Sequence, residues 1–386
     1  MAARAPPLRT ALIGLSSSAA TSWASGAHLP GLLSQTGRSK LPITALLNSS
    51  VEAAKAAINS YDLPSTTKAY GSPEDLANDP EIDFVICNTR VDKHFQTILP
   101  SVKKGKDVYV EWPIASNLDD VNVLVDEARK SGSRVAVGLQ RRWVPPVTRV
   151  RELLKEGRLG KVLSSDVRAF GGTNDREILP ESLKYFADRK VGGNPIVIGF
   201  MHMFDFVLSA LGDLDLSTVS TKLQLQRPDI RIRNRSTNEI VDQIRSDVPD
   251  LLSLHGTLAS SQATLSVGFR RGQPFPGTPS FVWTINCEKG EIRVVSPAAL
   301  SLESGDVKNP VTIHVHWFAD DIVEEVKWEW NEEQQKLPLM ARSVMRCLTS
   351  IADGKAEGDG WVGLEDAAKR AKMVDGFLRD WDKSSK

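Results

Sequence analysis

Residues Ile82–Glu111 read IDFVICNTRVDKHFQTILPSVKKGKDVYVE, with a short apolar run at each end. The first run, Ile82–Cys87, and the last, Asp107–Glu111, have the length and the β-branched and aromatic content of buried strands. Between them, His94–Lys104 carries apolar residues at helical spacing. A strand, a helix and a second strand in this order predict a βαβ unit, in which the two strands are parallel.

The same alternation extends over the first third of the chain. Further strands are predicted at Leu8–Gly14, Ile43–Leu47 and Arg134–Gly138, with helices at Val51–Asn59 and Leu118–Lys130. These strands are continuously apolar, which is typical of a parallel sheet covered by helices on both faces. We therefore expect an α/β domain at the N-terminus.

The pattern changes after about residue 145, where Pro145 and Pro146 interrupt the alternation. Strands dominate the rest of the chain, so we expect a large, open, mostly antiparallel sheet. Strands are predicted at Val162–Phe170, Ala263–Phe269, Ser280–Cys287, Glu291–Val295, Val311–Trp317 and Glu325–Trp330, and helices at Val147–Glu156, Ile196–Leu211, Leu337–Ala352 and Leu364–Trp381. The polar, charge-mixed segment Arg231–Pro249 is interpreted as an exposed connection.

Composition excludes several classes of protein. The 386 residues include 48 Lys plus Arg and 48 Asp plus Glu, so the formal net charge is zero, whereas nucleic-acid-binding proteins and proteins attracted to membrane surfaces normally carry a basic excess. Three scattered cysteines form no CxxC pair, and His314 and His316 have no third ligand nearby, so no metal site is predicted. Without a long apolar run or a signal peptide, a cytoplasmic protein is expected.

The turn after the first strand is a candidate phosphate site. Gly14 is followed by Ser16, Ser17 and Ser18, small residues that permit close backbone approach and can donate hydroxyls to phosphate. Only one glycine of the usual G-x-G-x-x-G pattern is present, so an ordinary strand–helix turn with a serine cap is the alternative. At the ribose position after the second strand stand Asn48 and Ser49 in place of an acid, which leaves NAD or NADP open.

Motifs along nearly the whole chain resemble those of the Gfo/Idh/MocA oxidoreductases. The matching residues are Thr89 and His94 after the third strand, Gly105-Lys106-x-Val108 before the fourth, Glu111-Trp112-Pro113 after it, GLQRRWVP at Gly138–Pro145 and GGNPIVIGFMHMFD at Gly192–Asp205. The resemblance implies a Rossmann NAD(P)-binding domain over residues 1–145 and a C-terminal α/β substrate and dimerisation domain over residues 146–386. It also implies that the last helix returns to the first domain and that the cofactor lies in the cleft.

The resemblance further implies which residues serve the cofactor and the reaction. Thr89, His94, Glu111, Trp112 and Gln140 would lie beside the cofactor, with Trp112 and Ile198 standing where the family has a catalytic lysine and an aspartate. His202 would transfer a proton, Asp205 would orient it, and Arg142 would lie at the edge of the cleft. The alternatives are a core histidine, a routine helix contact and a salt bridge at the domain junction.

The segment Val110–Asp119, VEWPIASNLD, is most similar to one fungal branch of the family, which contains the galactose-pathway repressor. Two functions therefore remain open. One is an NAD(P)-dependent oxidoreductase acting on a hydroxyl or carbonyl of a sugar, polyol or secondary metabolite. The other is a non-enzymatic regulator that senses the dinucleotide and binds a transcriptional activator, in which case a nuclear location is possible. Either form is expected to be a homodimer through the C-terminal sheet.

Overall fold

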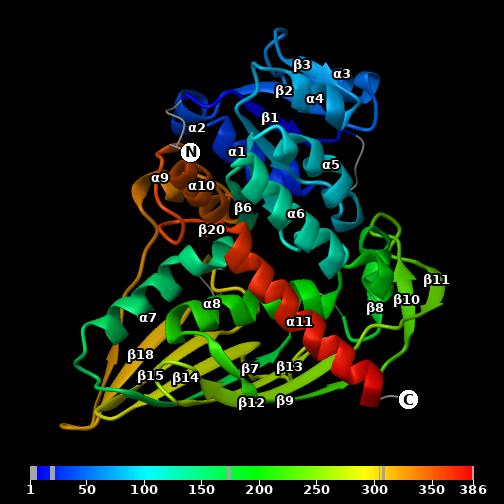
Figure 1. Cartoon of the computed structure of the whole chain (residues 1–386). Helices are drawn as coiled ribbons and strands as arrows, with labels where there is room; N and C mark the ends of the chain where they lie inside the picture. Colours follow the sequence, from blue (N-terminus) through cyan, green and yellow to red (C-terminus); the bar gives the residue numbers. More distant parts are fainter. Residues whose placement is uncertain (1–6, 18–21, 172–174, 304, 307–308, 385–386) are drawn as a thin grey trace. The chain divides into compact units, whose positions relative to one another are not determined.

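A computed structural model describes residues 7–17, 22–171, 175–303, 305–306 and 309–384 of the chain (Figure 1). Its contacts divide into two compact units, which are described separately. Unit 1 comprises Met1–Gln140, Lys190–Gly193 and Asn331–Met373, and unit 2 comprises Arg141–Arg189, Asn194–Trp330 and Val374–Lys386. This division differs from a single cut at residue 145, because a segment close to the C-terminus completes unit 1.

Unit 1 is built on a seven-stranded sheet with the order β20-β6-β5-β4-β1-β2-β3. All pairs are parallel except β20 with β6. The strands are β1 (Thr10–Ile13), β2 (Ile43–Leu47), β3 (Lys68–Tyr70), β4 (Phe84–Cys87), β5 (Asp107–Glu111), β6 (Val135–Gly138) and β20 (Val362–Gly363). The predicted Rossmann-type sheet is confirmed, and its central strands are completely buried because helices cover them.

The helices of unit 1 begin at polar caps that the chain supplies locally. Ser50, Ser72 and Asn117 each accept a backbone N–H of the first turn of the helix that follows them. The helices are η1 (Ala24–His28), α1 (Leu29–Leu32), α2 (Gln35–Lys40), α3 (Val51–Ser60), α4 (Pro73–Asn78), α5 (Val91–Lys103), α6 (Leu118–Ser131), η4 (Arg189–Val191, from unit 2 into unit 1), α9 (Glu332–Gln335) and α10 (Leu339–Ala352). Helix α10 packs on η1 and α1, which explains why residues after 330 belong to this unit. The last helix, α11 (Leu364–Ser384), starts in unit 1 and ends in unit 2.

Unit 2 contains an eight-stranded sheet with the order β19-β18-β15-β14-β7-β13-β12-β9. Only β7 and β13 pair in parallel, so the expected open, mostly antiparallel sheet is confirmed. The strands are β7 (Val162–Phe170), β9 (Leu214–Gln224), β12 (Leu251–Leu258), β13 (Thr264–Arg270), β14 (Phe281–Cys287), β15 (Gly290–Ser296), β18 (Thr312–Trp317) and β19 (Ile322–Glu325). The short pair β16 (Gly305–Asp306) and β17 (Asn309–Pro310) stands apart from it.

Helices α7 (Pro145–Lys155) and α8 (Met201–Leu211) lie over one face of this sheet (Figure 1). Pro145 and Pro146 begin α7, where the missing N–H of proline costs no hydrogen bond, so they mark a helix start as well as a break. The predicted helix over Ile196–Leu211 is two elements, because a π-helix, η5 (Pro195–Phe200), precedes α8. The short helices η2 (Gln140–Trp143) and η3 (Glu181–Ala187) complete the helical part.

Two predictions for unit 2 are wrong. Arg231–Pro249 is not simply an exposed connection, because β10 (Asp229–Arg233) and β11 (Ile240–Arg245) form a three-stranded sheet with β8 (Ile178–Pro180). Ile230 and Ile232 alternate with charged residues and are buried against Leu179 and Phe186, a period-two pattern hidden in a polar sequence. The second wrong prediction is the strand at Glu325–Trp330. Strand β19 lies earlier, at Ile322–Glu325, and residues 326–330 are not in a strand.

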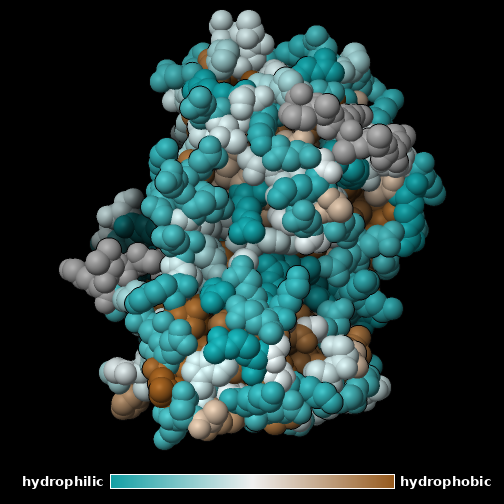
Figure 2. Space-filling view, turned by 90° about the vertical axis from the view of Figure 1, so that its left-hand side faces the viewer, coloured by the Kyte–Doolittle hydropathy of each residue, from teal (hydrophilic) through white to brown (hydrophobic). Residues whose placement is uncertain are grey.

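Hydrophilic residues predominate on the face shown in Figure 2, and hydrophobic residues form separate patches there. Among the described residues, no helix is both long and apolar enough to cross a bilayer. In the same part of the chain, no group of three or more His, Cys, Asp or Glu could hold a metal ion.

Candidate functional site

The carboxyl ends of the parallel strands of unit 1 bring the predicted cofactor residues to one edge of the sheet. Gly14 follows β1 directly and has φ +86°. A Cβ at this position would lie 3.1 Å from the backbone of Asn88, which follows β4. The turn after β1 therefore needs glycine both for its conformation and for its close approach to the neighbouring strand end, as a phosphate-binding turn does.

The serines after this turn are only partly described. The carbonyl of Ser16 accepts a hydrogen bond of 2.9 Å from the Tyr61 hydroxyl, and Ser17 is exposed. Ser18 lies outside the described residues. The carbonyl of Ser16 is thus held by Tyr61, the residue that follows α3. The exposed hydroxyl of Ser17 is a candidate phosphate donor.

Asn48, at the predicted ribose position, supports the phosphate turn. Its Nδ2 donates to the Leu15 carbonyl at 2.9 Å and to the Ala53 carbonyl at 3.3 Å. Ser49 beside it is exposed, and Ser50 caps α3 by accepting the Ala53 N–H. Neither Asn48 nor Ser49 is an acid that would repel a 2′-phosphate, so the choice between NAD and NADP stays open.

Asn88 is a candidate cofactor residue that sequence reasoning missed. Both polar atoms of its side-chain amide are buried, and neither has a hydrogen-bond partner among the described residues. Buried amides are normally satisfied, so an unpaired one at this edge points to a polar ligand. Its position, one residue after the buried run Phe84–Cys87, is the signal that could have identified it.

His94 holds two loops of this edge together. One ring nitrogen lies 2.8 Å from the Thr89 carbonyl and the other 2.8 Å from the Pro113 carbonyl. Burial lowers the pKa of His94, although both carbonyls act in the opposite direction. His94 therefore fixes the loops after β4 and β5 and has no ring nitrogen left for the cofactor. Thr89 lies in the first of these loops, with its hydroxyl 3.4 Å from the Cys87 sulfur.

The ends of β5 and β6 contribute the remaining predicted residues. Glu111 lies 2.5 Å from Nε2 of His28, a buried partner on η1 that the sequence did not reveal. Trp112 is 4% exposed and precedes Pro113 in a cis peptide. Gln140 is buried as well, and its Oε1 accepts no hydrogen bond from the described residues. Asn88 and Gln140 thus present unpaired polar atoms at the end of this sheet where the phosphate turn lies.

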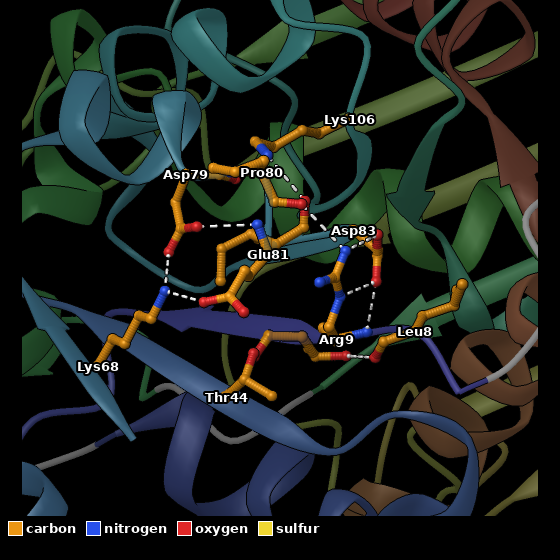
Figure 3. Close-up of polar contacts among 11 residues, drawn as sticks. Leu8, Arg9, Thr44, Lys68, Asp79, Pro80, Glu81, Asp83 and Lys106 are labelled. Carbon is orange, nitrogen blue, oxygen red and sulfur yellow. Dashed lines mark hydrogen bonds and ion pairs between the residues drawn. The ribbon is translucent and has the colours of Figure 1, made fainter. Parts of the chain in front are cut away.

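The opposite, amino end of the sheet carries a cluster of charged side chains that pair with one another and with backbone carbonyls (Figure 3). Arg9 binds the Asp83 carboxylate through two nitrogens at 2.8 and 2.9 Å. Lys68 bridges Asp79 and Glu81, and the buried Lys106 donates to the Asp79 and Ile82 carbonyls at 2.7 Å each. This amino-end cluster joins segments of the sheet. Its charged groups are engaged by other groups of the protein, so we assign the cluster a structural role.

Unit 2 contains a cavity of about 260 Å³ that includes His202. It lies among η5 and the start of α8, the end of β13, the segment η3 and the loop 299–301. Most of its wall is apolar, and its polar or charged side chains are few. The apolar side chains are Leu183, Phe186, Pro195, Ile198, Phe269, Ala299 and Leu300, and the polar ones are Arg141, His202, Arg271 and Ser301.

His202 meets this cavity as a neutral imidazole. Burial, helped by the positive charge of Arg141, holds the pKa of His202 well below its ordinary value. Its Nδ1 is buried and has no hydrogen-bond partner among the described residues. An uncharged, unpaired imidazole nitrogen in a small apolar cavity can accept a proton from a bound hydroxyl or donate a hydrogen bond to a carbonyl, depending on its tautomer.

Asp205 and Arg142 form a buried ion pair with each other. Arg142 donates from Nε and Nη2 to the two Asp205 oxygens at 2.8 and 2.6 Å, and both side chains are buried. Asp205 is thus engaged by Arg142, which joins η2 to α8, and no hydrogen bond links it to His202. Arg141, the preceding residue, lines the cavity instead and lies 3.6 Å from Glu303.

Comparisons with known proteins identify the family. Residues 8–139 match the model of the oxidoreductase family with an NAD-binding Rossmann fold, and residues 145–296 match the C-terminal domain of Gal80p. The dehydrogenase aclE of Aspergillus oryzae is 31% identical over 89% of this chain and 87% of its own length. The chain belongs to the Gfo/Idh/MocA oxidoreductase family.

A further relative, Gal80, is similar to the chain in sequence and in fold. The galactose/lactose metabolism regulatory protein GAL80 of Saccharomyces cerevisiae is 26% identical over 77% of this chain and 68% of its own length. The crystal structure of a super-repressor mutant of Gal80p from the same yeast has a TM-score of 0.83, with 21% identity over 98% of this chain and 97% of the other. The family is one that uses a nicotinamide dinucleotide, and Gly14, Asn88 and Gln140 fit such a ligand.

Proposed function

We propose that this protein is an NAD(P)-dependent oxidoreductase that acts on a hydroxyl or carbonyl group of a small molecule. The observation that carries the proposal is the cavity of unit 2, in which His202 is buried, uncharged and unpaired at Nδ1. A purely structural histidine in a core is normally hydrogen-bonded at both nitrogens or packed without a cavity beside it. Membership in the oxidoreductase family supports the same function.

Each residue then has a role that its contacts support. Gly14 and the exposed Ser17 would receive the phosphates, and the unpaired amide of Asn88 and Oε1 of Gln140 would bind polar groups of the dinucleotide. The dinucleotide supplies hydride transfer when it is bound. Nδ1 of His202 would take the proton of a substrate hydroxyl or return it to a carbonyl. The Arg142–Asp205 pair holds α8 one turn after His202, and so positions His202.

The test is binding followed by turnover. The full chain is titrated with NAD, NADH, NADP and NADPH, and sugars, polyols and ketones are then screened at the absorbance of the reduced nicotinamide. We expect turnover of at least one compound and its loss in His202→Gln, with dinucleotide affinity retained. His255→Gln, which alters an exposed histidine of β12, is the matched control and should remain active. Turnover that survives in His202→Gln would contradict the role of His202.

The second candidate is a regulator that binds the dinucleotide and a transcriptional activator without catalysis. It is favoured by the residues that the family resemblance places at the catalytic positions, because Trp112 and Ile198 can neither relay a proton nor carry a charge. A GAL80-like relative is a regulatory protein. Tight dinucleotide binding with no turnover, together with dinucleotide-dependent binding of an acidic amphipathic activator peptide, would support this candidate.

The open face of the large sheet is the proposed homodimer surface. It carries a shallow hollow of about 580 Å³ bordered by side chains of β7, β9, β12, β13 and β14, among them Arg168, Lys222 and Val282. Sedimentation of the wild type and of Val282→Asp tests this, with a shift toward monomer expected in the variant. A cytoplasmic location, or a nuclear one for the regulator, stays a prediction that imaging of the tagged chain would test.

A further inference from the structure

Arg271 is a buried cation on the wall of the same cavity. It follows β13 and is 8% exposed. No carboxylate lines the cavity with it, because all other lining residues are apolar, neutral or basic. Its Nη2 donates to the Ile178 carbonyl at 3.0 Å, and its Nε has no hydrogen-bond partner in the described part of the chain. A guanidinium with one unmet donor is costly to bury without a counter-charge.

The nearest acidic groups do not supply that counter-charge directly. Both oxygens of Asp250 accept backbone N–H groups, of Gln226 at 2.9 Å and of Arg227 at 2.8 Å. Asp175 accepts from the backbone of Glu177 and from Gln273. Both carboxylates act on Arg271 only through space, and its burial outweighs them and lowers its pKa. Arg271 forms no ion pair with any of the described residues.

The wall of the cavity therefore carries positive charge. Arg141 is the second guanidinium on its wall, and its partner Glu303 lies 3.6 Å away, farther than a direct hydrogen bond. A ligand with an anionic group would satisfy Nε of Arg271 and complete the charge balance of the site. A carboxylate matches a guanidinium best because it accepts two parallel N–H bonds.

The rest of the cavity selects for an apolar body. Phe186, Phe269 and Leu183 form much of the wall, and Leu183 and Phe186 belong to or pack against the small core under the sheet of β8, β10 and β11. Ile198 lies in the same wall, one turn before His202, and packs on that small core too. Few hydroxyl or amide groups line the cavity, so a polyhydroxylated ligand such as a free sugar would leave most of its hydroxyls unpaired.

From these observations we infer that the cavity binds a small apolar carboxylate, with the carboxylate on Arg271 and the aliphatic or aromatic body against Phe269, Phe186 and Ile198. The inference rests on the proposed function, since it names the substrate class of that same site. A hydroxyl or carbonyl of such an acid would then meet His202. The substrate is an apolar hydroxy or keto acid under this assignment, and sugars and simple polyols are poor ligands.

Binding of a matched pair of probes tests this without depending on any variant. The probes are 3-phenylpropanoate and its uncharged analogue 3-phenylpropanamide, titrated calorimetrically into the full chain at neutral pH, with and without saturating dinucleotide. We expect the acid to bind at least about tenfold more tightly than the amide, since a charge-assisted bidentate bond is lost in the amide. Equal affinity of acid and amide, or tighter binding of a polyol such as sorbitol, would overturn the assignment.

Two pairs of variants locate the binding group. Arg271→Met should abolish the preference for the acid, whereas Arg235→Met, at an exposed arginine in the turn between β10 and β11, should leave it unchanged. Ile198→Asp would place a carboxylate in the wall and should weaken the acid at least about tenfold by like-charge repulsion, while Ile198→Asn keeps the size without the charge and should not. A preference for the acid that persists in both Arg271→Met and Ile198→Asp would place the site elsewhere.

The outcomes separate this inference from the proposed function. Dinucleotide binding and turnover of some neutral substrate, without a preference for acids, would leave the oxidoreductase standing and reject the carboxylate site. An Arg271-dependent acid site without any turnover would keep the site and reject the oxidoreductase. Binding of an acidic peptide in preference to the small acid would reject the small-molecule assignment.

Discussion

The two ends of the parallel sheet in unit 1 both carry polar residues, but these residues differ in whether they have hydrogen-bond partners. In the amino-end cluster, Arg9, Lys68 and Lys106 each have two hydrogen-bond partners within 3.0 Å (Figure 3). At the carboxyl end, the Asn88 amide and Oε1 of Gln140 are buried and unpaired in the described chain. The difference teaches that polar groups which stabilise the fold are saturated by the fold, whereas groups kept for a ligand are not.

Unit 2 repeats this contrast within one helix. Asp205 on α8 is saturated by Arg142, and His202, one turn earlier, presents an unpaired nitrogen to a cavity. Substitutions in saturated groups should therefore cost stability and spare binding, and substitutions in unsaturated groups should do the reverse. The predictions below test this separation in order of expected size.

The largest effect is expected at Asp205. Asp205→Asn removes the carboxylate charge that the buried Arg142 guanidinium binds through two nitrogens, so the free energy of unfolding should fall by about 3–5 kcal/mol. Chemical denaturation measures it. The control is Asp229→Asn, whose exposed partner Arg245 lies 3.5 Å away, and there the loss should stay below about 1 kcal/mol. Similar losses in both variants would contradict the structural role assigned to the Arg142–Asp205 pair.

Lys106→Met should come next. The buried ammonium donates to two backbone carbonyls, of which that of Asp79 also accepts the Ile82 N–H at 3.3 Å. Its removal takes one hydrogen bond from each carbonyl, so unfolding should become easier by about 1–3 kcal/mol. Dinucleotide affinity should not change, because this cluster lies at the other end of the sheet. The exposed neighbour Lys104→Met provides the baseline for both measurements. Weakened dinucleotide binding in Lys106→Met would break the comparison between the two ends.

Asn88→Ala should show the opposite pattern. No hydrogen bond to a described residue is lost, so the free energy of unfolding without ligand should be unchanged or slightly higher. The dissociation constant for the dinucleotide should rise about tenfold, which corresponds to about 1.4 kcal/mol. Calorimetric titration measures it, with the exposed Asn59→Ala as control. A variant that is destabilised but binds normally would show Asn88 to be structural.

The smallest effect is expected from filling the cavity at Gly199. A Cβ there would be 3.7 Å from the Phe269 ring, an ordinary contact, and Gly199 lies inside η5. Gly199→Ala should raise the free energy of unfolding by up to about 1 kcal/mol and weaken ligand binding in the cavity. Gly14→Ala should be destabilising, because φ is +86° there and the Cβ would crowd Asn88. Thermal unfolding measures both variants. A higher melting temperature for Gly199→Ala and a lower one for Gly14→Ala would support the account, and a loss of stability in Gly199→Ala would contradict the empty space assigned there.

Much of the fold could be predicted because its buried strands appear in the sequence as apolar runs. Ile43–Leu47, Asp107–Glu111 and Val162–Phe170 were predicted with the bounds that the structure shows. Some strands that escaped prediction are short or polar, as in β3 (Lys68–Tyr70) and the pair β10 and β11, whose few apolar residues stand among charges. The longer strands β9 (Leu214–Gln224) and β12 (Leu251–Leu258) were not predicted individually either. Tertiary packing, which local sequence does not express, makes these segments strands.

The site was harder to predict than the fold. Family resemblance drew attention to Asp205, Arg142 and Glu111, but not to how they pair. Asp205 pairs with Arg142, and Glu111 pairs with His28, which is 83 residues away in sequence. Arg271 was missed because nothing in a surface-like sequence such as FRRGQP indicates that a guanidinium will be buried. Which polar atoms stay unpaired is a property of three-dimensional packing alone.

A crystal structure of the full chain with a bound nicotinamide dinucleotide would test the central claim most directly. The account predicts that the dinucleotide phosphates lie at the turn after Gly14 and that the side-chain amides of Asn88 and Gln140 gain hydrogen bonds to the ligand or to its ordered waters. The amino-end cluster should be unchanged. A dinucleotide bound elsewhere, or bound with the Asn88 and Gln140 amides still unpaired, would contradict the claim that unsatisfied polar groups mark the functional end of this sheet.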